Sequence, residues 1–301
     1  MAEISGVLVV NKHEGVTSHD IVNKIRRLYG TKRVGHTGTL DPLATGVLVV
    51  LVGRAAKAAE YLVSDEKSYR ATLKLGIATN TEDITGTIIT TSDELPVSEQ
   101  VASVCREFVG KIKQIPPMYS ALKVGGKKLC DIAREGKEIE REAREIEIFS
   151  LDCAPTEHKS EYILDVRCSS GTYIRTLCAD IGARLGCGGV MATLERREAG
   201  GFALTQSYTI DELEKMNECE REALLIPTES LFEGLERVTL SSFYEKLCRN
   251  GCEIYLKKIR KDLPIGTRVT LWNEEGVFFA LGEVREYSEG KAIKSIKAFD
   301  V

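Results

Sequence analysis

The chain has 301 residues, of which 43% are hydrophobic and 29% charged, and its formal net charge at pH 7 is −4. This composition excludes disordered, collagen-like and low-complexity chains, and the length fits one large domain or two. The longest nearly apolar run, residues 43–52, is about half the roughly 20 residues that a membrane-spanning helix needs. An acid near the N-terminus and an odd number of cysteines without Cys-x-x-Cys spacing predict a reduced, cytoplasmic protein.

The first 75 residues predict strands and helices in turn. The β-branched run at residues 6–10 is typical of a strand. A helix is expected to start at Thr17 or Ser18 and to end at Gly30, because apolar residues follow at helical spacing. A polar, glycine-bearing loop is then predicted over residues 32–42, a strand over 46–52, a short helix over 54–62 and an alternating strand over 67–75.

The rest of the chain lacks a βαβαβ rhythm. Helices are predicted over residues 99–108, 128–135 and 172–185, and strands over 146–151 and 162–168. We therefore expect an α+β fold with a mixed, largely antiparallel sheet flanked by helices. A break near residues 231–236 divides the chain into domains 1–232 and 233–301. Short β-like runs at 268–271, 277–281 and 292–296 predict a small C-terminal β-barrel.

Positive charge is unevenly distributed along the chain. Five lysines and no acids occur between residues 110 and 130, namely Lys111, Lys113, Lys123, Lys127 and Lys128. A phosphate-binding surface depends on such local charge more than on net charge. The alternative is an ordinary solvated face of the protein.

The densest group of unusual residues is Gly-His-Thr-Gly-Thr-Leu-Asp-Pro, residues 35–42. The two glycines permit unusual backbone geometry and a close approach of a ligand. Asp41, followed by Pro42 and an apolar strand, is expected at the rim of a cleft. Its alternative is an Asx-turn aspartate that bonds only its own backbone. The segment lacks the spacing of a P-loop.

Five segments in the same order resemble the TruB family of tRNA pseudouridine-55 synthases. RVGHTGTLDPLATGVL (residues 33–48) resembles the catalytic motif of that family. The other matching segments are VNKHEGVTSHDIV (10–22), KSYRATLKLGIATNTEDITG (67–86), QIPPMYSALKVGGKKL (114–129) and CSSGTYIRTLCADIG (168–182). The resemblance implies a pseudouridine synthase fold for domain 1–232 and a PUA-like RNA-binding barrel for domain 233–301.

The resemblance also implies an isomerase that converts uridine-55 in the T-loop of tRNA to pseudouridine. The base is flipped out, its N-glycosidic bond is cut and the base is rejoined through C5. Asp41 is then the catalytic carboxylate, in the manner of a nucleophile in a retaining glycosidase. No cofactor and no metal are expected, since no electrons change hands and the four histidines show no ligand spacing with the cysteines.

Further site residues follow from the same resemblance. Arg175 would pair with Asp41 and keep it ionised and oriented. Tyr69 would stack on the flipped uracil, and His36 would occupy the space that the base vacates. Leu194 would pack beside the pocket, although Glu195 interrupts the leucine-arginine-arginine of the family.

Contacts with the tRNA backbone are expected from Lys12, Arg33 and the lysines of residues 111–128. The basic run at residues 257–261 would add contacts near the acceptor stem, and its alternative is a solvated basic face. The predicted partner is thus tRNA at its T-loop and elbow, bound by a monomer without membrane or protein partners. The alternatives are a relative that works with guide RNA and accessory proteins, and a non-catalytic RNA-binding or tRNA-folding protein.

Overall fold

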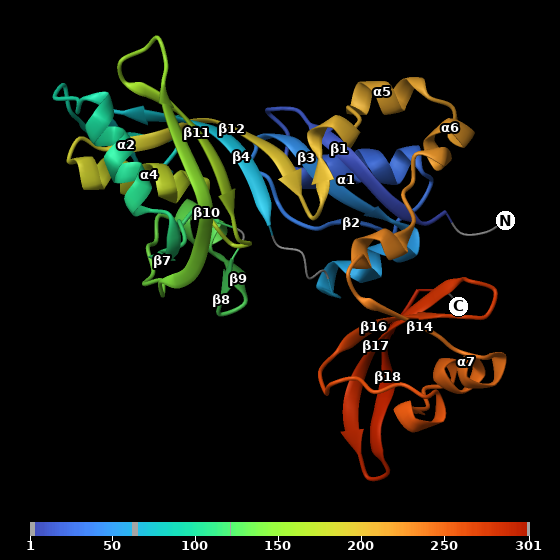
Figure 1. Cartoon of the computed structure of the whole chain (residues 1–301). Coiled ribbons are helices and arrows are strands. Elements are labelled where there is room, and N and C mark those ends of the chain that lie inside the picture. Colours follow the sequence, from blue (N-terminus) through green and yellow to red (C-terminus); the bar gives the residue numbers. More distant parts are fainter. Residues whose placement is uncertain (1–3, 62–65, 121, 300–301) are drawn as a thin grey trace.

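The structure is a computed structural model that describes residues 4–61, 66–120 and 122–299, without the side chains of Lys123 and Lys128. Two β-sheets organise the chain. A nine-stranded sheet runs through the larger part and a five-stranded sheet forms a smaller C-terminal part, which lies beside the N-terminal half of the large sheet (Figure 1).

The N-terminal half of the large sheet is built on two apolar strands. Strand β1 (Gly6–Lys12) pairs antiparallel with β3 (Thr45–Val52), and nearly every residue of both is buried. The short strand β2 (Val34–His36) pairs with the last residues of β3. This pairing corrects the prediction of an uninterrupted loop over 32–42. Three residues are too few to show a strand pattern, and β2 exists because β3 offers it a free edge.

The other half of the sheet continues in the order β3-β12-β4-β11-β10-β7. Strand β12 (Gly189–Ala199) touches β3 in parallel at two positions only and pairs antiparallel with β4 (Lys67–Leu75). Strands β11 (Glu161–Cys168), β10 (Arg144–Pro155) and β7 (Gly110–Gln114) follow, all antiparallel, and β13 (Phe202–Ala203) pairs with β12. The predicted mixed, largely antiparallel sheet is confirmed.

Several helices pack against the large sheet. Helix α1 (Ser18–Leu28) starts with a capping box between Thr17 and Asp20, which selects Thr17 from the two predicted caps. Helices α2 (Ser98–Glu107) and α4 (Ile174–Leu185) pack together against the β10–β12 half (Figure 1). Helices α5 (Ile210–Lys215) and α6 (Glu218–Ala223) follow the sheet. None of the helices in the described ranges combines the length and apolar character that a bilayer crossing requires.

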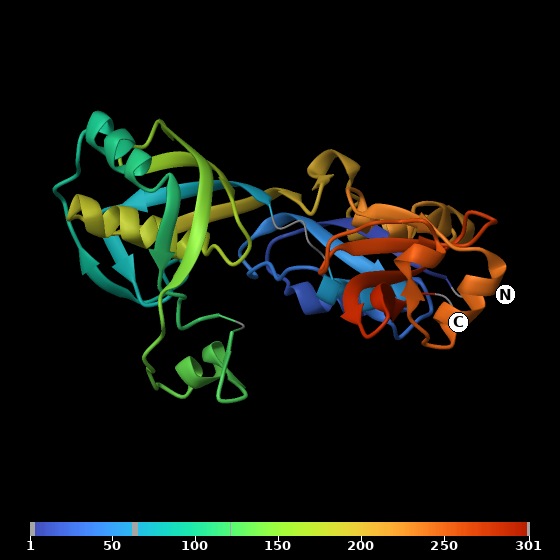
Figure 2. The same ribbon diagram turned by 60° about the horizontal axis from the view of Figure 1, so that its bottom comes forward.

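Several smaller elements lie outside the two main sheets. The predicted helix over 54–62 is the 3-10 helix η1 (Gly53–Tyr61), and residue 62 lies outside the described ranges. Strands β5 (Ile77–Thr79) and β6 (Ile88–Thr91) form a hairpin. A lobe that contains β8 (Lys123–Val124), β9 (Lys127–Lys128) and α3 (Leu129–Arg134) projects away from the body (Figure 2).

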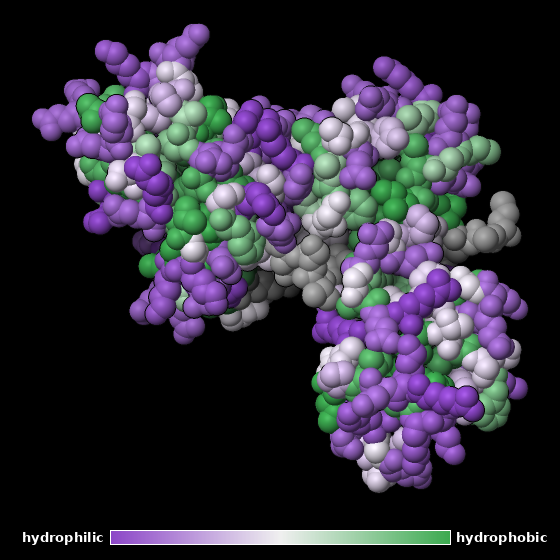
Figure 3. All heavy atoms as spheres, in the orientation of Figure 1, coloured by the Kyte–Doolittle hydropathy of each residue, from purple (hydrophilic) through white to green (hydrophobic). Residues whose placement is uncertain are grey.

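The C-terminal part has the strand order β14-β16-β17-β18-β15. These strands are β14 (Glu236–Thr239), β15 (Ile254–Tyr255), β16 (Arg268–Trp272), β17 (Phe278–Tyr287) and β18 (Gly290–Ala298), with α7 (Ser242–Arg249) between β14 and β15. Within the described residues β14 and β15 are the edges of the sheet, so the sheet is a half-barrel, and the predicted small PUA-like β-barrel is not confirmed. Its visible face is mostly hydrophilic (Figure 3).

An aromatic cluster joins the C-terminal part to the larger one. Phe232, at the end of the 3-10 helix η3 (Thr228–Phe232), packs against Phe278 and Phe299, with ring centroids 6.0 and 5.7 Å apart. Ala58 of η1 is buried in the same cluster. The cluster contains residues from both sides of the predicted boundary at 232/233, and that boundary stays a prediction.

Candidate active site

The segment between β2 and β3 is clamped from the side of β1 and α1. Ser18 Oγ accepts from the amide of Leu40 at 2.8 Å and donates to its carbonyl at 3.1 Å. Lys12 Nζ donates to the carbonyl of Ala44 at 2.6 Å. Because all of these groups are buried, Asp41 is carried on a rigid support rather than on a free loop.

The glycines of this segment have no special backbone conformation. Neither Gly35 nor Gly38 adopts a positive φ, so the unusual backbone geometry predicted for them is absent. A Cβ at Gly38 would instead lie 3.6 Å from Arg196 Nη1 and 3.8 Å from Lys67 Nζ. These are ordinary van der Waals distances, so two basic groups lie beside Gly38 without excluding a Cβ there.

Arg196 clamps the same segment from the opposite side. It is 1% exposed and belongs to β12. Its guanidinium donates to three main-chain carbonyls, from Nε to Val47 at 2.7 Å, from Nη2 to Gly38 at 3.0 Å and from Nη1 to Thr39 at 3.4 Å. The segment that carries Asp41 is thus held between β1 and β12.

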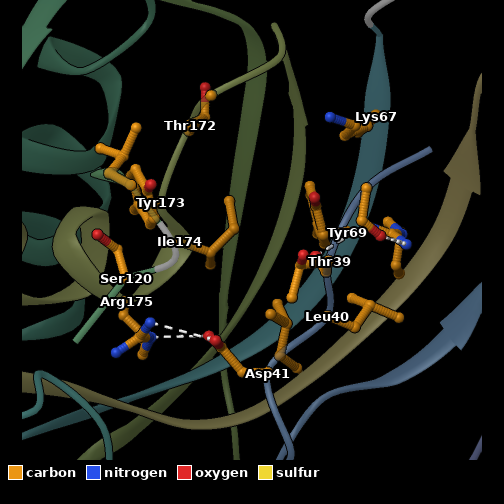
Figure 4. A pocket seen from close by; sticks show the side chains of 15 residues that line it. Thr39, Leu40, Asp41, Lys67, Tyr69, Ser120, Thr172, Tyr173, Ile174 and Arg175 are labelled. Carbon is orange, nitrogen blue, oxygen red and sulfur yellow. Dashed lines mark hydrogen bonds and ion pairs between the residues drawn. The ribbon is translucent and has the colours of Figure 1, made fainter. Parts of the chain in front are cut away.

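A pocket of about 340 Å³ opens between this segment and the N-terminus of α4 (Figure 4). Of the predicted site residues it brings together Asp41, Tyr69, Arg175 and Leu194. The lining side chains that sequence reasoning missed include Lys67, Ser120, Tyr173 and Arg196. The alternation along β12 could have indicated Arg196, because it is two residues from Leu194 and shares its face.

The Asp41 carboxylate is bound by Arg175 through both oxygens (Figure 4). Nε lies 2.8 Å from Oδ2, and Nη2 donates to Oδ1 at 3.2 Å. Further bonds from the guanidinium to the carbonyls of Thr81 and Tyr119 hold it in place, at 3.1 and 2.9 Å. The Arg175 side chain is 6% exposed and that of Asp41 35%, so the carboxylate faces the pocket while its partner is buried behind it.

Asp83 is a second carboxylate near Arg175. Its Oδ2 lies 3.9 Å from Nη1, and its Oδ1 accepts from the hydroxyl groups of Thr81 and Thr85 at 2.8 and 2.6 Å. Asp83 therefore fixes the turn whose Thr81 carbonyl receives Arg175. The sequence signal was the acidic turn after the predicted strand 67–75.

Tyr69 on β4 and Leu194 on β12 are diagonal neighbours across the two strands and form an apolar wall of the pocket. Tyr69 is 7% and Leu194 also 7% exposed. Burial raises the pKa of the Tyr69 phenol, and the Arg196 guanidinium opposes that rise. An aromatic ring at this position could stack on a planar base inside the pocket.

Three predicted site residues lie elsewhere. The Lys12 side chain is fully buried, and burial lowers its pKa to about 8. A side chain without exposed surface cannot contact a phosphate, so the predicted RNA contact of Lys12 is wrong and its role is to clamp the loop. His36 and Arg33 are absent from the pocket, at and just before β2, where β2 runs along the half of β3 remote from Asp41. Burial lowers the pKa of His36, and its Nδ1 has no partner among the described residues.

Only some of the predicted basic side chains are described by the structure. Lys111, Lys113 and Lys127 are exposed, whereas the side chains of Lys123 and Lys128 lie outside the description. In the C-terminal part Lys257 bonds the carbonyl of Glu289, and Lys261 pairs with Glu236 at 2.7 Å. In residues 4–61, 66–120 and 122–299, no three His, Cys, Asp or Glu side chains gather closely enough to hold a metal.

Comparison with known proteins decides the family. The sequence model of the TruB family pseudouridylate synthase N-terminal domain matches residues 26–174, and that of the tRNA pseudouridylate synthase B C-terminal domain matches residues 175–233. The chain belongs to the TruB family. The two matches meet at Arg175, so the Asp41–Arg175 pair joins both.

Full-length relatives agree with this family. The chain is 42% identical over 297 residues to tRNA pseudouridine synthase B of Alkaliphilus oremlandii, which covers 98% of each chain. It is 40% identical to the Neisseria meningitidis protein of that name, covering 94% of this chain and 91% of that one. The Clostridium perfringens protein is 38% identical, with 93% and 95% covered.

Solved structures show the same fold. A chain in the crystal structure of a Cbf5–Nop10–Gar1 complex superposes with a TM-score of 0.73 at 25% identity, covering 98% of this chain and 84% of that one. A chain of the archaeal box H/ACA sRNP Nop10–Cbf5 complex gives 0.69 at 23% identity, covering 98% and 86%. The TruB-family chain thus shares its architecture with proteins found in RNA–protein particles.

Proposed function

We propose that this TruB-family chain is a tRNA pseudouridine synthase that isomerises uridine-55 in the T-loop of tRNA. The observation that carries the proposal is the Asp41 carboxylate, which is fixed by Arg175 in a pocket walled by Tyr69 and Leu194. Relatives of 38–42% identity named tRNA pseudouridine synthase B support the substrate class. The Cbf5 likeness alone would also suit a guide-dependent enzyme.

The pocket suits a reaction on a base that has left its stack. Its volume of about 340 Å³ is at the lower end of the range for small-molecule sites. Tyr69 supplies a π-face for the flipped uracil. Arg175 orients Asp41, so the carboxylate can add to the sugar carbon C1′ or to C6 of the base. The glycosidic bond then breaks, and the base rejoins through C5 with loss of the C5 hydrogen.

The surroundings of the pocket suit a large, charged RNA. We infer that Lys67 at the pocket and the exposed lysines of residues 111–127 contact the tRNA backbone. We also propose that residues 233–301 form a separate RNA-binding domain of PUA-like type, which reaches toward the acceptor stem through the basic run at 257–261. A monomer that acts in the cytoplasm without protein partners completes this proposal.

The test is tritium release from tRNA labelled at C5 of uridine, with purified protein, no cofactor and EDTA present. Isomerisation through C5 expels that hydrogen, so one equivalent should be released per tRNA. Release should vanish when uridine-55 is replaced by cytidine. Absence of release with folded protein would overturn the proposal in favour of guide-dependent or binding-only function.

A further inference from the structure

Two buried cations flank the segment that carries Asp41, and neither is matched by a carboxylate. Lys12 is 0% and Arg196 1% exposed. The hydrogen bonds that they donate end on main-chain carbonyls, and neither forms an ion pair with a described acid. Arginine and lysine are almost never fully buried unless they are paired. A buried cation without a carboxylate partner is therefore a candidate for a functional role.

Of the two, only Arg196 borders the pocket. It lies behind Gly38 and Thr39 and is the residue of β12 that pairs with Tyr69 of β4. Arg175, on the opposite side, has two carboxylates within 4 Å, Asp41 and Asp83. The pocket is thus lined by one guanidinium whose charge is balanced and by another whose charge is not.

The proposed reaction moves negative charge toward the base, and the inference rests on that proposed function. If Asp41 adds to C1′, an O–C1′ bond forms and the electron pair of the C1′–N1 bond leaves on N1 as a uracil anion. If Asp41 adds to C6, an O–C6 bond forms and the C5=C6 pair moves through C4 onto O4 as an enolate. In both cases the negative charge of Asp41 ends on the uracil ring.

We propose that Arg196 stabilises the negative charge that develops on the uracil, while its three carbonyl bonds hold it in place beforehand. A cation that is already held in place needs no reorganisation during the reaction. Arg175 is less suited to this task, because Asp83 stays beside it when Asp41 loses its charge. The two arginines thus have different roles. Arg175 orients the carboxylate, and Arg196 stabilises the negative charge once it has moved from the carboxylate to the uracil.

The experiment compares two tRNAs that carry uridine or 5-fluorouridine at position 55. Fluorine withdraws electrons from the ring, so the fluorinated base bears negative charge more easily and needs less help. Single-turnover consumption of each nucleoside is followed by mass spectrometry of digested tRNA, and tRNA binding is measured separately. The variants are Arg196→Gln and Arg196→Met, which remove the charge at similar size. The matched control is Arg197→Gln, which changes the adjacent, half-exposed arginine on β12 that pairs with Glu195.

Loss of one preorganised charge should slow uridine turnover by about 100-fold or more. With 5-fluorouridine the loss should shrink by about tenfold, because less charge needs stabilisation. Binding of tRNA and the activity of the Arg197→Gln control should stay near wild type. An equal loss on both substrates would show a structural role only and overturn the proposal. Failure of both neutral variants to fold would assign Arg196 to stability and overturn it as well. Inactivity of the wild type on uridine would refute the proposed function instead.

Discussion

Replacing Arg175 tests the link between the Asp41 geometry and turnover. Arg175→Met removes the ion pair between Nε and the carboxylate at 2.8 Å, one charge-assisted hydrogen bond from Nη2 at 3.2 Å, and two hydrogen bonds to main-chain carbonyls. A hydrogen bond to a charged group contributes about 1.5–3 kcal/mol. Since Asp41 is 35% exposed, water replaces part of this, and we expect about 3.5 kcal/mol to be lost from transition-state stabilisation. This corresponds to a rate about 300-fold lower.

Arg175→Lys keeps the positive charge but not the two-nitrogen geometry of the guanidinium. It should therefore lose one of the two contacts with Asp41, which is worth about 2 kcal/mol, or a rate about 30-fold lower. The assay is single-turnover tritium release, with tRNA binding measured in parallel. Binding should hardly change, because a side chain 6% exposed does not reach phosphate. Arg70→Met is the matched control, since Arg70 forms an equally two-pronged pair with Asp165 on the exposed face of β4. The reasoning is refuted if Arg175→Met keeps more than a tenth of the rate.

Three further predictions concern the frame of the pocket. In Gly46→Ala, a Cβ at φ 96° would overlap the carbonyl of Arg196, so the free energy of unfolding should fall by about 3 kcal/mol in denaturant titrations. Gly200→Ala, at φ 60° in open space, should cost only about 1 kcal/mol. Burial lowers the Lys12 pKa from 10.5 to about 8, so between these values the unfolded chain binds more protons and wild-type stability rises with pH. Relative to Lys12→Met, the gain from pH 7.5 to 10 should be about 2.4 kcal/mol, and a constant difference would contradict the shift. Lys67→Ala should weaken tRNA binding about fivefold and reduce the salt slope by about one, whereas an unchanged slope would exclude a phosphate contact.

Local patterns predicted elements well where the side-chain period is clear. Strand β4 begins and ends where the alternation of residues 67–75 does, and α1 begins where Thr17 can cap it. Strand β2 could not be foreseen, because three residues acquire a strand conformation only from the neighbouring β3. The open edges of the C-terminal sheet also depend on tertiary pairing, which short β-like runs do not reveal.

The site residues that lie in the family motifs could be predicted from the sequence. The roles of residues that depend on whether a side chain is buried could not. Asp41, Tyr69, Arg175 and Leu194 converge on one pocket, as the resemblance implied. Lys12 was misjudged, because a lysine in a polar sequence is usually solvated, whereas three carbonyls receive this one. Arg196 and Arg197 look alike in sequence, yet one is buried at the pocket and the other pairs on the surface.

The central claim is that Asp41 converts uridine-55 of tRNA to pseudouridine. The most direct measurement locates pseudouridine at single-nucleotide resolution in one tRNA treated with the wild type or with Asp41→Asn. We predict full conversion at position 55 alone with the wild type, and none with Asp41→Asn despite unchanged tRNA binding, because the phosphate contacts are intact. Pseudouridine at another position, or formed by the Asp41→Asn protein, would contradict the account.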